Sequence, residues 1–413
     1  MKKLFIIFFI VFVGGIVLLC SDNEKSVLVS TKQSEIKISS ALTMMYETDA
    51  GSGEYQVSND SHFLEDGYIF NDKLSKCENG GKLTWSEETN QVILEANRSD
   101  RCYVFFDKHN VVNFAEYIKS LYTSDGTNGI YLHDGSGTYG SQETGDGSYR
   151  FSGANPNNYV CFGTDENPCP YENLYRIIGV FDNQVKLIKH DILTEEIVGY
   201  VDYTYAKDGS LGICNAYNGN NAIVDYYYWS GSSSNNTTWD NSTLNKIALN
   251  TTYYNSFSPN WQEMIANHNW QIGGGTFDNI SKNIPKVSYS YELGNNSTKK
   301  YYSAKIGLMY VSDYGYAASP EAWNTILYNY HLSDIKKNNW LYLGTSELLI
   351  TPRTSSTIYY NFSVYGDEGC NGDPPGYIQG FSSGVIRPTF YLNEDVKVSD
   401  GIGTIENPYR LVM

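Results

Sequence analysis

The sequence predicts an α+β protein built mainly from short strands. Among its 413 residues are 37 tyrosines and 37 glycines, and only 18% of residues are charged. This composition is typical of a globular, β-rich chain rather than a disordered one. Runs of alternating apolar and polar residues recur along most of the chain, whereas helical spacing is confined to a few short segments. The length allows two or three domains.

The charge balance argues against nucleic acid as a partner. The chain has 46 acidic and 29 basic side chains, and its formal net charge is −17 at pH 7. No stretch gathers enough lysine or arginine to follow a phosphate backbone.

The N-terminal segment, residues 1–20, predicts a signal peptide or a membrane anchor. Two lysines precede an apolar run of roughly 16 residues, so the chain beyond this run is expected to be exported and to touch a membrane only here. For Cys20 two alternatives stay open, a lipid-modified cysteine and an ordinary one, because Leu19 precedes it rather than a small residue. Residues 21–40 are polar without a clear period and predict a stalk.

Residues 41–108 are expected to form a small all-β domain. Within it, KLTW and QVILEA flank SEETN, which has the length of a hairpin loop. Cys77 precedes this hairpin and Cys102 follows it. A domain of this size is stabilised by a disulfide, and these two cysteines would supply one.

Cysteines in an exported chain favour disulfides over metal binding. Besides Cys20, the chain has six. The predicted pairs are Cys77 with Cys102, Cys161 with Cys169 and, by subtraction, Cys214 with Cys370. No Cys-x-x-Cys or His-x-x-x-His spacing is present, so no zinc site is expected.

Residues 109–156 are expected to form one helix followed by a linker rich in Gly, Ser and Asp. The helix is predicted within Val112–Tyr122, where Phe114, Ile118 and Leu121 have helical spacing and Asn113 can serve as the cap.

Two interpretations compete for the linker. Asp125, Asp134 and Asp146 could supply carboxylates to calcium, or the stretch is an exposed connector. The alternate ligand positions and terminal Glu of an EF-hand are missing, so we expect a connector and no cofactor.

Residues 157–413 are expected to form a second, larger domain. Tyr175–Val180 and Gln184–Lys189 alternate as two strands joined at Asp182-Asn183. Ser242–Tyr254 predicts a helix, and Ser258–Ile265 predicts another. The residues expected on one face of the first helix are Leu244, Ile247, Ala248 and Thr251.

Two further features of this domain concern its strands. The aromatic run Tyr226–Trp229 is either a sugar-stacking surface or a strand with alternate rings buried. Ile306–Val311 predicts a buried strand, and Gly384–Leu392 a closing strand cut by Pro388.

Several segments of residues 159–413, taken in order, resemble a large family of bacterial exported domains of unknown function. The segments are Phe162-Gly163, LYRIIGV at Leu174–Val180, VKLI at Val185–Ile188, Thr238–Tyr254, Lys305–Ala317, Asn339–Pro352, a glycine near residue 366 and GVIRPTFYL at Gly384–Leu392. The chain departs from the family pattern at Tyr175, where Trp is usual, at Thr351, where Ser is usual, and at the inserted Ile386.

This resemblance implies a fold similar to C-type-lectin and sulfatase-modifying-factor domains. Such a fold combines a twisted antiparallel sheet with a few short helices and a long irregular region, here between Ser312 and Gly380, where ligand-binding residues are then expected. The candidates are Trp340, Tyr342, Arg353, Asp367 and Glu368. The alternative role of Trp340 and Tyr342 is strand core, and that of Arg353 is pairing with a surface carboxylate.

Three functions stay open. The first is a cell-surface module that binds a glycan or protein of a host or of the cell wall. The second is a hydrolase or modifying enzyme acting on wall polymers, and the third is a structural surface component. No GxSxG, P-loop or HExxH pattern is present, and no carboxylate pair has a signature spacing. Binding is therefore expected rather than catalysis.

Overall fold

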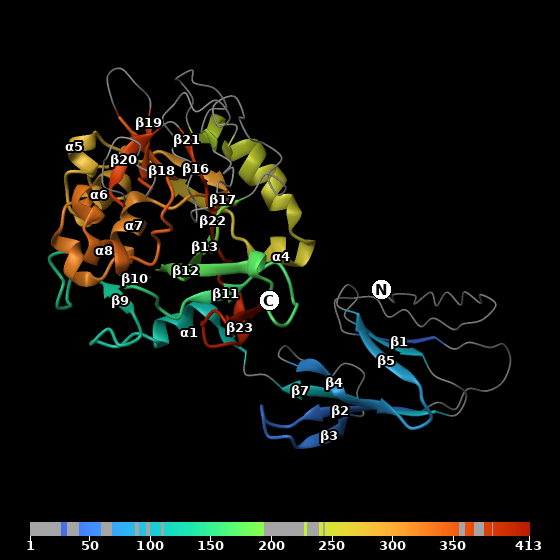
Figure 1. Ribbon diagram of the computed structural model, residues 1–413. Helices are drawn as coiled ribbons and strands as arrows, with labels where there is room; N and C mark the ends of the chain where they lie inside the picture. The colour runs from blue at the N-terminus through green and yellow to red at the C-terminus, as the bar shows by residue number, and fades with distance from the viewer. Residues whose placement is uncertain are drawn as a thin grey trace, which may run out of the picture. The chain divides into compact units, whose positions relative to one another are not determined.

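A computed structural model of the chain separates into two compact units, a small unit of residues 1–111 and a large unit of residues 112–413 (Figure 1). The described residues are 26–30, 41–58, 68–86, 91–95, 100–108, 111–193, 227–228, 239–242, 244–354, 360–366, 376–381 and 383–413. The N-terminal segment with Cys20, and the predicted pair Cys214–Cys370, lie outside them.

The described part of the small unit consists of strands in two sheets. One sheet has the order β3-β2-β7-β4 and the other β1-β6-β5. Their bounds are β1 Ser26–Ser30, β2 Ala41–Glu47, β3 Tyr55–Ser58, β4 Tyr68–Cys77, β5 Lys82–Ser86, β6 Gln91–Glu95 and β7 Arg101–Lys108. The predicted hairpin is confirmed, because β5 and β6 pair antiparallel. The predicted disulfide is also confirmed and joins Cys77 of β4 to Cys102 of β7.

One segment of the small unit differs from its prediction. Ser26–Ser30, expected to be part of a stalk, is strand β1 and pairs in parallel with β6. The run SVLVS has the short apolar stretch and the β-branched residues of a strand, and the polar residues around it obscured this signal in the sequence.

A seven-stranded sheet is the centre of the large unit. Its order is β17-β22-β13-β12-β10-β9, with β11 also paired to β12, and these pairings are antiparallel. The strands are β9 Ile130–His133, β10 Ser148–Phe151, β11 Tyr159–Cys161, β12 Leu174–Phe181, β13 Gln184–Lys189, β17 Ile306–Gly307 and β22 Thr389–Tyr391. The predicted pair of strands around Asp182-Asn183 is therefore confirmed as β12 and β13.

The prediction of a linker after the first helix is wrong, because two strands of this sheet lie in that segment. β9 and β10 fall within residues 109–156; β9 pairs with β10, and β10 pairs with β12, so this segment is part of the large unit. Each strand has four residues and is flanked by Gly, Ser and Asp, which made the whole stretch look like a connector. The helix predicted before it is confirmed as α1, Phe114–Ser120, and Asn113 Oδ1 accepts a bond from the Glu116 amide at 3.0 Å.

Helices and smaller sheets complete the large unit. The helical segments are η1 Tyr171–Asn173, η2 Trp239–Asn241, η3 Leu244–Tyr253, η4 Tyr254–Ser256, α4 Pro259–Met264, α5 Phe277–Ile280, α6 Pro285–Glu292, α7 Val311–Ala317, η5 Pro320–Asn324, η6 Leu327–His331 and α8 Ser333–Lys337. The strands outside the large sheet are β8 Val112–Asn113, β14 Tyr227–Tyr228, β15 His268–Gln271, β16 Tyr301–Ala304, β18 Glu347–Arg353, β19 Tyr360–Val364, β20 Ile378–Phe381, β21 Ser383–Gly384, β23 Lys397–Asp400 and β24 Arg410–Val412. The α6, α7 and α8 helices gather beside the β18-β19-β20 sheet (Figure 1).

Both helices predicted between residues 242 and 265 are present, but only the second is an α-helix. Trp261 and Met264 of α4 are buried, in the predicted helix. The segment η3 is a π-helix, whose i→i+5 bonds shift its faces relative to an α-helix. Of the four residues expected on one face, Leu244 and Ala248 are buried, whereas Ile247 and Thr251 are exposed. Leu249 is buried instead.

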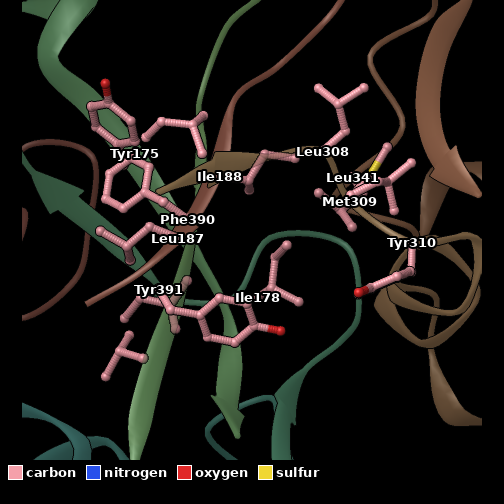
Figure 2. Close-up of a cluster of buried hydrophobic side chains, with 14 of the residues drawn as sticks. Tyr175, Ile178, Leu187, Ile188, Leu308, Met309, Tyr310, Leu341, Phe390 and Tyr391 are labelled. Atoms are coloured by element: carbon pink, nitrogen blue, oxygen red, sulfur yellow. The ribbon is translucent and has the colours of Figure 1, made fainter. Parts of the chain in front are cut away.

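The core of the large unit lies where β12, β13 and β22 meet the chain after β17. Tyr175 of β12, Leu187 of β13 and Phe390 of β22 converge there with Met309 (Figure 2). Aromatic rings meet edge to face, with Phe162 and Tyr175 centroids 5.5 Å apart. Burial of such rings dominates core energetics. Ile306–Val311, predicted as one buried strand, is buried throughout, but only Ile306–Gly307 is strand, and α7 begins at Val311.

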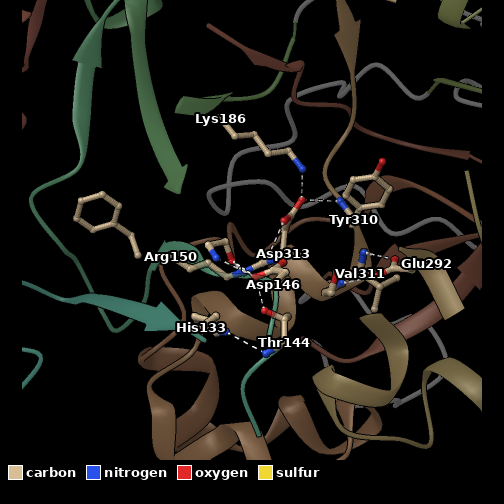
Figure 3. Close-up of polar contacts among 12 residues, drawn as sticks. His133, Thr144, Asp146, Arg150, Lys186, Glu292, Tyr310, Val311 and Asp313 are labelled. Carbon is tan, nitrogen blue, oxygen red and sulfur yellow. Dashed lines mark hydrogen bonds and ion pairs between the residues drawn. The ribbon is translucent and has the colours of Figure 1, made fainter. Parts of the chain in front are cut away.

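A buried charge network fastens α7 to this sheet. Asp313 accepts from Lys186 Nζ at 2.6 Å and from the Tyr310 amide at 2.9 Å, and it lies 3.4 Å from Arg150 Nη1 (Figure 3). Arg150 also pairs with Asp146 at 3.0 Å. Burial lowers the pKa of Lys186, and the charge of Asp313 opposes that shift. Buried charges persist only where they are paired. Lys186 therefore depends on Asp313, whereas Arg150 shares its charge between Asp313 and Asp146.

Replacing Asp313 with asparagine should destabilise the large unit strongly. Asp313→Asn leaves Lys186 and Arg150 buried beside a neutral amide, and the free energy of unfolding should fall by about 3–5 kcal/mol. Urea denaturation measures this. The matched control is Asp278→Asn, which removes an exposed ion pair with Lys282. The Asp278 side chain is 75% accessible. This variant should cost less than about 1 kcal/mol. Equal losses in the two variants would refute a special role for Asp313.

Candidate functional site

The large unit has an open depression of about 490 Å³ beside α1. Its size lies within the roughly 300–1,000 Å³ that small-molecule sites occupy. Fourteen residues line it: Tyr117, Leu121, Gly126, Thr127, Asn128, Gly129, Phe151, Ser152, Ala154, Asn155, Pro156, Asn157, Ile402 and Tyr409. We call it the asparagine depression. None of these fourteen described residues carries a charge, although the whole chain has a net charge of −17.

One wall of the depression is formed by two glycine turns after α1. Gly126 and Gly129 have φ angles of +69° and +68°, a left-handed conformation that favours glycine. A Cβ atom on Gly126 would come within 2.5 Å of the Tyr131 hydroxyl. These turns present Asn128 on the rim, where its Nδ2 donates to the Leu121 carbonyl at 2.7 Å. The Asn128 Oδ1 is then left as an acceptor.

A second part of the wall, Ser152 and residues 154–157, is held by Arg176 of β12. Its Nη2 donates to Asn155 Oδ1 and to the Pro156 carbonyl, each at 3.1 Å. The guanidinium lies between two rings, 4.3 Å from the Tyr159 centroid and 4.6 Å from the Trp340 centroid. Burial lowers its pKa to about 10, which still leaves it charged at neutral pH. Arg176 therefore fixes the orientation of Asn155, so that Nδ2 of this side chain is available as a donor.

Apolar surface completes the depression. Tyr117 of α1 meets Tyr409 edge to face with centroids 5.6 Å apart. Burial, with the neighbouring Tyr117, raises the pKa of Tyr409, so this phenol stays neutral. Ile402, in the turn between β23 and β24, is 59% exposed. The depression therefore combines an acceptor, a donor and partly exposed apolar side chains without charge.

The residues predicted from the sequence lie elsewhere. Trp340 is buried, donates to the Phe151 carbonyl at 2.9 Å and packs on Arg176, so it supports the asparagine depression from behind. Tyr342 is half-buried, and Lys336 Nζ lies 5.4 Å from its ring centroid. Arg353 is half-buried at the end of β18, over the Phe277 ring. Asp367 and Glu368 lie outside the described residues.

The three aspartates weighed for calcium are engaged in local bonds. Asp125 accepts from the Thr127 amide at 3.1 Å, and Asp134 accepts from the Ser136 amide at 2.8 Å. Asp146 pairs with Arg150. In the described part of the chain, the cluster with metal-ligand spacing is Cys77, Asp100 and Cys102, and its two sulfurs are joined in the disulfide.

Sequence reasoning missed the depression because its parts are far apart in the chain. A local signal was present in the turn sequence Asn155-Pro156-Asn157 and in the spacing of Gly126 and Gly129. Such turns are common, and nothing in the sequence joins them to Tyr409.

Glu292 is a buried carboxylate beside the start of α7. It accepts from the amides of Val311 and Ser312 at 2.8 and 2.9 Å and from the Thr351 hydroxyl (Figure 3). Burial raises its pKa to about 7, against the lowering effect of these bonds. Perturbed carboxylates often mark active sites. Glu292, however, is fully buried, and its hydrogen bonds go to other groups of the protein. It fixes the start of α7.

No protein-family model, curated protein or solved structure matches this chain. Among the described residues, the helices are all too short or too polar to cross a membrane. The geometry of the asparagine depression is therefore the basis for assigning a function.

Glu292 should make stability fall as the pH rises. Its folded-state pKa is about 7, against an ordinary value of 4.5, so its stabilising contribution is complete below about pH 4.5 and is lost as the pH rises through 7. Urea unfolding at pH 5 and pH 8 measures this. The wild type should lose about 2 kcal/mol more than Glu292→Gln over that interval. The control Glu394→Gln, at an exposed carboxylate, should follow the wild type. A Glu292→Gln variant with the wild-type pH slope would contradict the assignment.

Proposed function

We propose that the protein is an exported binding module and that the asparagine depression holds a carbohydrate. The observation that supports this is the uncharged lining, in which amide groups of Asn128 and Asn155 accompany the Tyr117 ring and Ile402. Hydroxyl groups of a sugar both donate and accept, and its C–H faces pack on rings and aliphatic groups. A saccharide therefore fits such a mixed surface better than an anion or a purely apolar ligand does.

The proposed ligand has no net charge. A carboxylated or sulfated glycan would need a basic partner in the depression, and the lining residues provide none. Arg176, which is bonded to the wall, donates to Asn155, Pro156 and Asn158 and stacks between two rings. Its role is to orient the wall.

Export and anchoring by residues 1–20 are part of the same proposal. Two disulfides support an oxidising compartment, since such bonds are rare in a reducing cytosol. The partner would be a glycan of a host or of the cell wall, met at the cell surface.

We also propose that residues 157–413 have the C-type-lectin-like arrangement and belong to the exported-domain family that the sequence resembles. In support, β17 and β22 pair with each other, and the chain between them forms α7, α8 and the β18-β19-β20 sheet. The fold was expected to carry a long region between Ser312 and Gly380, and this part of the chain lies there.

The hydrolase alternative needs two carboxyl groups beside the sugar. The fourteen lining residues, as far as the structure describes them, include neither Asp nor Glu. Binding is therefore the function that this surface supports.

A glycan-binding screen of the full-length protein, comparing neutral with acidic oligosaccharides, tests the proposal. The informative variant is Asn155→Asp, which keeps the Oδ1 acceptor for Arg176 and loses the Nδ2 donor. Affinity for a neutral glycan should fall about tenfold, as expected for the loss of one hydrogen bond.

The matched control is Asn324→Asp, an exposed position on η5 outside the lining. It should bind as the wild type does, and circular dichroism should show both variants folded. Absence of any glycan signal, or unchanged affinity in Asn155→Asp, would overturn the proposal.

A further inference from the structure

The two disulfides of the described chain lie in opposite electrostatic surroundings. The bond between Cys161 and Cys169 has a cation beside it, because Arg410 Nη1 lies 3.2 Å from Cys161 Sγ. The same nitrogen donates to the Glu166 carbonyl at 2.7 Å, within the loop that the disulfide closes. The Glu166 carbonyl therefore holds the Arg410 guanidinium beside the Cys161 sulfur.

The bond between Cys77 and Cys102 has a carboxylate beside it. An oxygen of Asp100 and both sulfurs lie within 4.8 Å of one another. Asp100 is buried and is held there by the amides of Asn79 and Gly81 at 2.8 and 2.9 Å. Arg101 is exposed and points to the opposite face of β7 from Cys102, since successive strand residues alternate.

Accessibility differs within the Cys161–Cys169 bond. Cys161 is completely buried at the end of β11, whereas Cys169 is half-buried and follows four exposed residues, 165–168. A thiolate arriving from solvent therefore reaches the Cys169 sulfur first, and the sulfur it displaces is Cys161, which faces Arg410.

Thiol exchange is faster when the departing sulfur is stabilised as a thiolate, which a neighbouring cation does and a neighbouring carboxylate opposes. We propose that Cys169 is a site of S-thiolation by low-molecular-mass thiols, with Cys161 as the leaving group and Arg410 as its counter-ion. The Cys77–Cys102 bond is structural and resists the same reagents.

The step balances as a simple exchange. A thiolate RS⁻ attacks Cys169 Sγ, the bond between the two cysteine sulfurs breaks, and the products are an R–S–S–Cys169 mixed disulfide and a Cys161 thiolate. The reagent is a monothiol such as glutathione, and no oxidant is consumed. Burial lowers the pKa of Arg410, and the neighbouring carboxylates of Asp165 and Asp400 oppose that shift.

Opening this bond would free the exposed loop next to the asparagine depression. Cys161 donates its amide to the Tyr409 carbonyl at 3.0 Å, and Tyr409 lines the depression. Arg410, which contacts the sulfur, is the next residue. The modification site stands on its own contacts, however, and does not depend on what the depression binds.

Differential alkylation with peptide mapping tests the order of opening. The native full-length protein is incubated with reduced glutathione at pH 7.5, quenched, and each cysteine is followed separately by mass spectrometry. Glutathione should appear on Cys169 and a free thiol on Cys161, while Cys77 and Cys102 stay joined at least about tenfold longer. Opening of Cys77–Cys102 at the same rate, or glutathione on Cys161, would overturn the proposal.

Variants at Arg410 test the role of its charge. Arg410→Met also frees the Glu166 carbonyl, so the thiol of Cys161 is monitored directly, through the pH dependence of its alkylation in the reduced protein. The midpoint should move up by about one pH unit in Arg410→Met and return toward wild type in Arg410→Lys. The control Arg101→Met should leave it unchanged. An unchanged midpoint in Arg410→Met would refute the counter-ion role.

Discussion

The carboxylate of Asp313 joins three segments of the large unit that are far apart in sequence. Lys186 belongs to β13, Arg150 to β10 and Asp313 to the first turn of α7, and their charged groups meet in the protein interior. Each of these charges would be costly to bury alone. These ion pairs therefore fix the position of the start of α7 relative to the sheet. Glu292 strengthens this constraint by binding the first amides of the same helix.

The asparagine depression also depends on a buried cation, Arg176 of β12. Arg176 is buried between the rings of Tyr159 and Trp340 and holds the wall that carries Asn155. A binding surface whose polar groups are oriented before the ligand arrives loses less conformational entropy on binding. Trp340, which the sequence marked as a ligand-binding candidate, is buried and packs on this arginine. Aromatic residues in this chain thus orient charged groups in addition to filling the core.

The two disulfides show how the same covalent bond acquires different chemistry from its neighbours. Both close loops in their own unit, with sequence separations of 25 and 8 residues. Asp100 lies beside one and Arg410 beside the other. The charge next to a sulfur decides how readily it departs as a thiolate. Cysteine spacing alone carries no information about that charge.

The sequence by itself determined the local elements of this protein. Alternation and the turn at Asp182-Asn183 specified β12 and β13, the Asn113 cap and helical spacing specified α1, and short separations specified both disulfide pairs. These signals act between neighbours in the chain. Only the tertiary structure made β9 and β10 part of a sheet, because four-residue strands need partners to form, and only it brought Tyr117, Asn155 and Tyr409 to one depression. Such contacts depend on packing between distant segments, which local patterns do not encode.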